Sequence, residues 1–152
     1  MRTLRPWRFN IGKRVVASPK VYLRDSSVVH ALLNIETRED LLGHPVTGAS
    51  WEGCALEAIV AAAPERSTPW FYRTSAGAEI DLVLELSPGR LAAFEVKRSA
   101  PAGAPARFRN ACDDIAAVHR FIVFPGPESY PLGGGLEALA ANKIALTVSG
   151  LK

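Results

Sequence analysis

Apolar and polar positions alternate through the middle of the chain, and this period of two predicts β-strands. The segments are WFYRT (70–74), EIDLVLEL (79–86) and LAAFEVKR (91–98). Residues 75–78 separate the first two and indicate a hairpin, and residues 87–89 join the second to the third. We therefore expect three consecutive strands at the centre of the fold.

Apolar residues recur at helical spacing on either side of these strands. The longest predicted helix covers SWEGCALEAIVAAA (50–63) and ends at Pro64. A second helix is expected within residues 108–119, and a short one over 28–33 is capped by Asp25. The remaining segments predict strands at 20–25, 120–125 and 143–149 and a loop at 35–49. This order predicts an α/β domain with a central mixed sheet flanked by helices.

Basic residues are concentrated near the start of the chain. Residues 1–24 contain seven bases and no acid, and the whole chain has a formal charge of +3. Prolines and the absence of a clean period predict an arm or connector over residues 1–19, followed by the folded domain, 20–152. Lys13 and Arg14 could contact nucleic-acid phosphates. A linker with solvated charges explains the same feature and is the better explanation of it alone.

Composition limits the classes of protein that fit. The 152 residues, 48% of them hydrophobic, are enough for one domain that buries roughly two thirds of its unfolded surface. No apolar stretch approaches the ~20 residues that cross a bilayer, and no signal-peptide core is visible, so we expect no membrane partner. Cys54 and Cys112 lack zinc-site spacing and are expected to be buried in a reducing cytoplasm.

Carboxylates fall at unusual positions on two of the predicted strands. If these strands pair antiparallel with Asp81 opposite Glu95, then Asp81, Glu95 and Lys97 share one face. Opposite residue numbers then sum to 176, which requires a loop of odd length such as residues 87–89. The alternative is that these are solvated charges on a half-exposed sheet.

The long helix adds a third carboxylate. At 100° per residue, Glu52 lies about 100° from Trp51, inside the apolar arc, whereas Glu57 lies at about 240°, in the polar gap. An isolated buried carboxylate is costly, so Glu52 must be paired, hydrogen-bonded or bound to a metal. Glu57 needs no such explanation.

These groups together predict a site for a hard divalent cation. Asp81, Glu95 and Glu52 would hold Mg²⁺ or Mn²⁺, because such ions are bound by carboxylate oxygens, waters and substrate phosphates. Lys97 could orient or deprotonate an attacking water and stabilise charge on phosphorus. Arg73 could contact a phosphate near Asp81, or it could be a charge at the strand edge.

Asp81 followed by Glu95-Val96-Lys97, on strands after a helix bearing Glu52, resembles the PD-(D/E)XK nuclease-like fold. This resemblance implies a restriction-endonuclease-like core in which the aspartate and the E-x-K motif carry the metal and the water chemistry. Ile80 stands where the name of the motif has a proline.

Longer segments are similar to the C-terminal domain of unknown function of prokaryotic AAA-type ATP-binding proteins. They include NIGKRVVASPKVYLRD, LLGHPVTGASWEG, FYRTSAGAEIDLVLE and AAFEVKRS. The resemblance implies an ATPase domain as partner, in cis in homologues or supplied in trans. The chain has no GxxxxGK[ST] loop, so we expect no ATP site here.

Two functions of different classes follow. One is a Mg²⁺-dependent nuclease that hydrolyses DNA phosphodiesters, with Asp81, Glu95, Lys97 and Glu52 as catalytic residues. The other is a non-catalytic domain that binds nucleic acid or protein and regulates a AAA-type ATPase. Replacing Asp81 or Lys97 with alanine distinguishes them, because only the nuclease would lose an activity.

Overall fold

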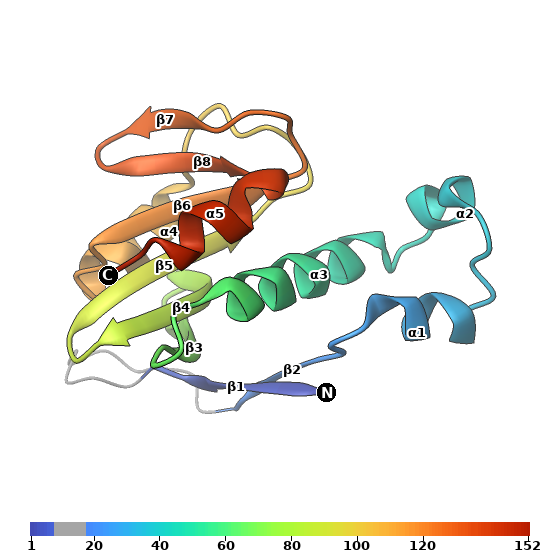
Figure 1. The fold of residues 1–152 in the computed structure, drawn as a ribbon, viewed down its shortest axis with the longest axis horizontal. Coiled ribbons are helices and arrows are strands. Elements are labelled where there is room, and N and C mark those ends of the chain that lie inside the picture. Colours follow the sequence, from blue (N-terminus) through green and yellow to red (C-terminus); the bar gives the residue numbers. More distant parts are fainter. Residues whose placement is uncertain (8–17) are drawn as a thin grey trace.

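The computed structural model describes residues 1–7 and 18–152, and a mixed sheet of eight strands lies at its centre (Figure 1). The strand order is β2-β1-β3-β4-β5-β6-β8-β7. The pairs β1–β3, β5–β6 and β6–β8 are parallel, and the other neighbours are antiparallel. The strands are β1 (Arg2–Pro6), β2 (Lys20–Tyr22), β3 (Thr68–Arg73), β4 (Glu79–Ser87), β5 (Arg90–Val96), β6 (His119–Phe124), β7 (Tyr130–Gly133) and β8 (Leu136–Ala140).

Helices cover both faces of this sheet, which confirms the predicted α/β class. Residues of α3 and α5 pack with one apolar cluster, and residues of α4 pack with a second cluster on the other face. The helices are α1 (Ser26–Leu32), α2 (Arg38–Gly43), α3 (Thr47–Ala62), α4 (Ala106–Asp114) and α5 (Ile144–Ser149), with a 3₁₀ turn at Ala141–Lys143. None of the helices in the described residues is long and apolar enough to cross a bilayer.

Residues 2–6 form a strand of the sheet, which corrects the part of the predicted arm, residues 1–19, in which they lie. Strand β1 pairs in parallel with β3, and Leu4 is completely buried. The Trp7 ring packs edge-on against Trp70 with 5.8 Å between ring centroids. This strand has no recognisable alternating pattern in the sequence, because Leu4 is its only buried apolar residue and its neighbours include basic residues and a proline. Lys13 and Arg14 lie outside the described residues.

Two short segments also differ from the sequence expectations. The segment 35–49 contains helix α2, which begins at a capping box formed by Thr37 and Asp40. Residues 144–149 form a helix instead of a strand, because Ile144 and Val148 are spaced to bury one helical face. Asp25 caps α1 as predicted, accepting a hydrogen bond from the backbone N–H of Ser27.

The predicted register between β4 and β5 is confirmed. Leu82 pairs with Phe94 and Leu84 with Ala92, so the residue numbers sum to 176. The connection differs from the expected three-residue loop, since Ser87 pairs with Arg90 and the register shifts between Glu85 and Ser87. A bulge in β4 therefore supplies the odd residue. Gly89 adopts a φ of 76°, a conformation that favours glycine in such a tight turn.

A second irregularity lies in β4, next to Asp81. Trp70 pairs with Val83 and Tyr72 with Ile80, so three steps along β4 match two along β3. Ile80 and Val83 consequently pack on the α4 face, although regular alternation along β4 would place Ile80 on the face of Leu82. Such a bulge re-aims the side chains around it. Asp81 therefore departs from the regular alternation of its strand.

Helices α1 and α2 and the first turn of α3, residues 26–50, extend away from the sheet (Figure 1). We call this segment the helical projection. Neither α1 nor α2 contains a buried residue, and Leu32 is 76% exposed. Cys54, on the α3 turn that follows, is exposed, which corrects the expectation that it is buried. Cys112 is buried, as expected.

Candidate active site at the ends of strands β4 and β5

Glu95 is a carboxylate inside the molecule, near the end of β5. Its side chain is only 1% exposed. The ammonium of Lys97 and the guanidinium of Arg107, 3.3 Å away, both bind its Oε1 atom. Its Oε2 atom is buried and has no hydrogen-bond partner within the described residues. One oxygen of this carboxylate is therefore neutralised, and the other is left for a further ligand.

Lys97 follows β5 directly, and its backbone is fixed from two sides. Its N–H donates to the carbonyl of Val123 at 2.8 Å, and its own carbonyl accepts from the Trp51 indole at 2.8 Å. The first bond ties Lys97 to β6, and the second ties it to α3. Its side chain turns back to Glu95, so the predicted proximity of these two residues is confirmed.

Asp81 occupies the irregular part of β4 and is also largely enclosed, with 15% of its side chain exposed. Its Oδ2 atom accepts a hydrogen bond of 2.9 Å from the Val96 N–H, and its Oδ1 atom lies 3.7 Å from the Lys20 ammonium. Burial, followed by the charge of Glu52, raises the pKa of Asp81 to about 6. Glu95 raises it further, while the Val96 N–H and Lys20 oppose the shift. Ionisation of Asp81 is thus less favourable in the fold than in water.

Glu52 projects from α3 toward β2. The Tyr22 hydroxyl donates a hydrogen bond of 2.8 Å to its Oε1 atom. Burial, with the charge of Glu52 as the next cause, raises the pKa of Tyr22 above its usual range, so the tyrosine remains a donor. The expectation that Glu52 needs a partner is therefore confirmed. Glu57, expected in the polar gap without need of a partner, is only 15% exposed and forms ion pairs with Arg2 and Arg24.

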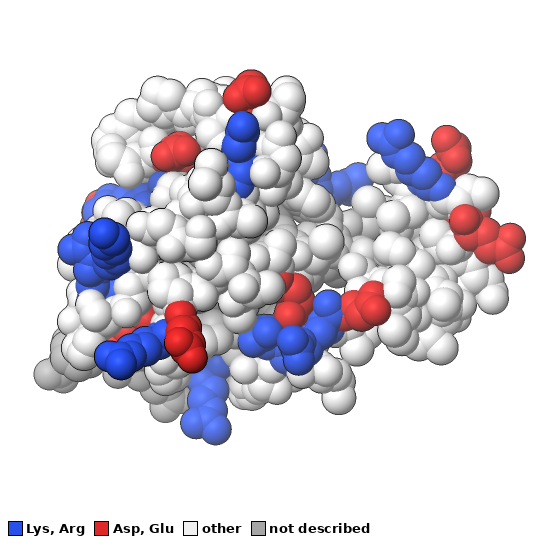
Figure 2. Space-filling view, in the orientation of Figure 1, with Lys and Arg blue, Asp and Glu red and all other residues white. Residues whose placement is uncertain are grey.

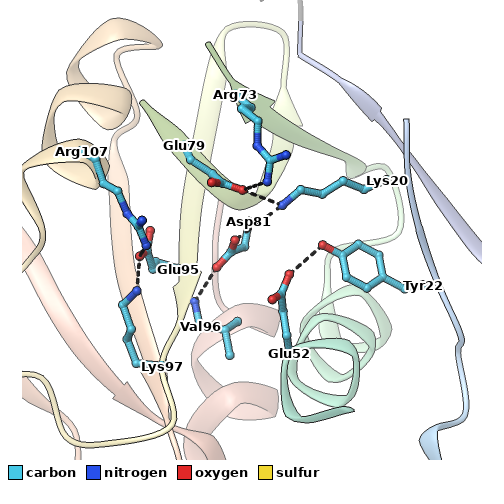
Figure 3. Close-up of polar contacts among 10 residues, drawn as sticks. All are labelled: Lys20, Tyr22, Glu52, Arg73, Glu79, Asp81, Glu95, Val96, Lys97 and Arg107. Carbon is cyan, nitrogen blue, oxygen red and sulfur yellow. Dashed lines mark hydrogen bonds and ion pairs between the residues drawn. The ribbon is translucent and has the colours of Figure 1, made fainter. Parts of the chain in front are cut away.

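Asp81 lies between two groups of side chains (Figure 3). Glu95, Lys97 and Arg107 are on one side of it, and Glu52 is on the other with Tyr22. No three His, Cys, Asp or Glu side chains form a cluster able to hold a metal in the part of the chain that the structure describes. The three predicted carboxylates are thus linked through Asp81 and do not surround one point.

Arg73 is engaged with Glu79, its partner across the β3–β4 pair. Glu79 also binds Lys20 at 2.9 Å, so a row of alternating charges runs along this edge of the site. This position supports the strand-edge alternative for Arg73.

Sequence reasoning missed three residues of the site. Lys20 and Tyr22 alternate within β2, and that period could have placed both on one face toward the site. Arg107 comes from α4 and reaches Glu95 across the fold, and no local spacing indicates that contact.

The residues present fit a magnesium ion in one particular way. Proteins bind Mg²⁺ through one or two carboxylates and leave the other positions to waters and substrate phosphates. Asp81 and Glu95 would be such a pair, since the β4–β5 register, continued one step beyond Leu82 and Phe94, brings residues 81 and 95 opposite each other. A closed cage of protein ligands is not required.

Residues 47–144, which include all four predicted catalytic residues, match a family model described as a domain of unknown function, DUF4143. The chain belongs to this family. It is 40% identical over 149 residues to the uncharacterized protein Mb2031c of Mycobacterium bovis and, at the same identity, to the uncharacterized protein Rv2008c of Mycobacterium tuberculosis.

Each alignment covers 98% of this chain and 33% of the relative, so the chain spans about a third of the length of the curated relatives it matches. No solved structure matches the chain. The family match includes α3 to β8 and excludes β1, β2, α1 and α2. Lys20 and Tyr22 therefore approach the site from outside the matched residues.

Proposed function

We propose that this domain is a Mg²⁺- or Mn²⁺-dependent nuclease that hydrolyses DNA phosphodiesters on a PD-(D/E)XK-like core. The observation that supports it most is the buried Glu95, whose Oε2 atom has no hydrogen-bond partner within the described residues, on the strand next to Asp81, whose pKa is raised to about 6 by burial and by neighbouring charges that include Glu95. Ionisation of two neighbouring buried carboxyl groups is costly, but it becomes favourable when a cation binds to both.

The residues divide the work as follows. Asp81 and Glu95 would hold the cation, and Glu52, anchored by Tyr22, would hold a water beside it. Lys97, beside Glu95, orients the attacking water and stabilises the negative charge that develops on phosphorus. Arg107 is 55% exposed, so its guanidinium can contact a DNA phosphate that approaches the site. The chemistry that bound Mg²⁺ supplies is polarisation of a phosphoryl oxygen and a lower pKa for its water.

A structural role explains these acids less well. A salt bridge to Lys97 and Arg107 satisfies one oxygen of Glu95, but burial of the second oxygen without a partner costs about 1–3 kcal/mol. Asp81 adds a second penalty, since its pKa is raised to about 6 and its ionised form at neutral pH therefore costs stability. A fold selected only for stability would replace such groups.

The proposal is tested by calorimetric titration with Mg²⁺ and Mn²⁺ of the wild type, Asp81→Asn, Glu95→Gln and the control Glu128→Gln. Glu128 is an exposed acid remote from the site, whereas the asparagine at 81 keeps an acceptor for the Val96 N–H. The same proteins are then incubated with plasmid and single-stranded DNA. Metal binding and cleavage are expected in the wild type and control and are expected to vanish together in the other two. A wild type that binds no metal would refute the nuclease.

A second function is a non-catalytic interaction domain that regulates a AAA-type ATPase. It is favoured by the contacts of Glu95 with Lys97 and Arg107, because these cations already neutralise one oxygen of the site. It also agrees with relatives that are three times longer than the matched region. In that case Asp81→Asn and Lys97→Met would leave binding of the ATPase domain unchanged. ATP itself is not proposed as a ligand of this chain.

A further inference from the structure

A separate cavity lies between the helical projection and the segments that follow β5 and β6. Its volume is about 450 Å³, within the range of small-molecule sites. His30, Arg38, Ser50, Trp51 and Arg98 are among the residues that line it. None of the carboxylates of the proposed metal site does so.

The charge of this cavity favours an anion. Arg38 and Arg98 line it, and no Asp or Glu is among its lining residues in the described part of the chain. The Arg98 side chain runs along the start of α3, where a Cβ built on Gly48 would lie 3.9 Å from its Cδ. In the space-filling view, both basic and acidic side chains lie around the recess between the projection and the body, so the preference for an anion rests on the residues that line the cavity itself (Figure 2). The two guanidiniums supply paired donors of the kind that bind phosphate.

The first turn of α3 adds to this preference. The helix has 16 residues, and its N-cap, Val46, makes no side-chain capping hydrogen bond. The N–H groups of Val46 and Thr47 already donate to His44, so the partial positive charge that this turn offers to an anion comes from the N–H groups of Gly48 and Ala49. Thr47 and Ser50 of this turn line the cavity, so the open turn and Arg98 meet at the same wall.

The cavity also has an apolar surface suited to a flat group, and Trp51 provides it. Its indole N–H is fixed to the Lys97 carbonyl at 2.8 Å, and the half-buried ring forms part of the cavity wall. Leu41 and Leu42 of α2 supply further apolar wall. A hydrogen bond of 2.7 Å between His30 Nε2 and Ser50 Oγ holds α1 against α3 and keeps the cavity formed.

We propose that this cavity binds a phosphate monoester on a flat aromatic body, that is, a mononucleotide. The phosphate lies between Arg38, Arg98 and the first turn of α3, and the base lies against Trp51. Its source is a free nucleotide or the 5′-phosphorylated end of a DNA strand, which present the same group. This binding requires neither Asp81 nor a metal.

Calorimetry in EDTA with AMP, adenosine and inorganic phosphate tests the proposal without any variant. AMP is expected to bind roughly tenfold or more tightly than either part, because both ends of the cavity are then used. The double variant Arg38→Gln/Arg98→Gln should lose roughly tenfold or more in affinity. The control Arg66→Gln removes an exposed arginine outside the cavity and should bind as the wild type does.

Two oligothymidines, with a 5′-phosphate or a 5′-hydroxyl, identify the source. Tighter binding of the phosphorylated strand than of AMP supports a strand end, and the reverse supports a free nucleotide. The proposal is overturned if AMP binds no better than adenosine and the two strands bind equally. It is also overturned if the double variant binds AMP as well as the Arg66→Gln control. Asp81→Asn should bind AMP normally, so failure of the nuclease would leave this result intact.

Discussion

The candidate site, at the start of β4 and the end of β5, buries its polar groups, whereas the helical projection keeps its polar groups at the surface. At the strand ends, Glu95 and Asp81 are enclosed by sheet and helix, and their charges face a small number of cations. In the projection, Thr37 and Asp40 cap α2 at the surface, and neither α1 nor α2 buries a residue. Charge in the first region is therefore tied to the stability of the whole fold, whereas the second region depends on local hydrogen bonds.

The largest effect is expected when the cation nearest to Glu95 is removed. Lys97→Met should lower the free energy of unfolding by about 3 kcal/mol, since it leaves a buried carboxylate with only the 3.3 Å contact to Arg107. Urea unfolding measures the change. Lys152→Met, which alters an exposed lysine, is the control. A loss no greater than that of the control would mean that the charges at the strand ends are solvated, like those of the projection.

Asp81→Asn should have the opposite sign at neutral pH. The pKa of Asp81 is raised from 3.8 in the unfolded chain to about 6 in the fold, so ionised Asp81 costs stability above pH 6. The variant should gain about 2–3 kcal/mol at pH 7.5. This gain should shrink as the pH falls through 6 and disappear below about 4, where wild-type Asp81 is protonated in both states. An equal gain at pH 4 and pH 7.5 would contradict the account.

The smallest effect is expected in the projection. Thr37→Ala removes the capping box of α2, which costs about 1 kcal/mol of local helix stability. Because α2 buries no residue, amide hydrogen exchange should accelerate in residues 38–43 and remain unchanged in β5. If β5 exchanged faster as well, the projection would be coupled to the sheet, and the contrast between the two regions would fail.

The strands of the sheet centre could be predicted from sequence because their apolar residues are local and periodic. The β4–β5 register also followed from the sequence, since one assumed pair, Asp81 with Glu95, determines all the others. The site was predictable only to that extent. The bulge beside Asp81 depends on how β3 pairs with β4, and the contact of Arg107 with Glu95 depends on where α4 packs.

Two other parts escaped prediction because their signals are short. Strand β1 has one fully buried residue, Leu4, among basic neighbours, and its place in the sheet comes from a parallel pairing with β3, far along the chain. The pair β7 and β8 lies around the glycines 133–135, and the apolar run of β8 has no alternation, since Ala138, Leu139 and Ala140 are all buried. A strand covered on both faces cannot be recognised by its period.

The central claim is that Asp81 and Glu95 bind a cation together, and the titration of the Asp81 carboxyl group tests it most directly. Carbon-13 NMR of this group, with and without millimolar Mg²⁺, follows its pKa at one atom. The account predicts a pKa of about 6 without the ion and a lower value with it, because a bound cation favours the ionised form. The Glu95→Gln variant should lose most of that decrease. An Asp81 pKa that Mg²⁺ leaves unchanged would contradict the account.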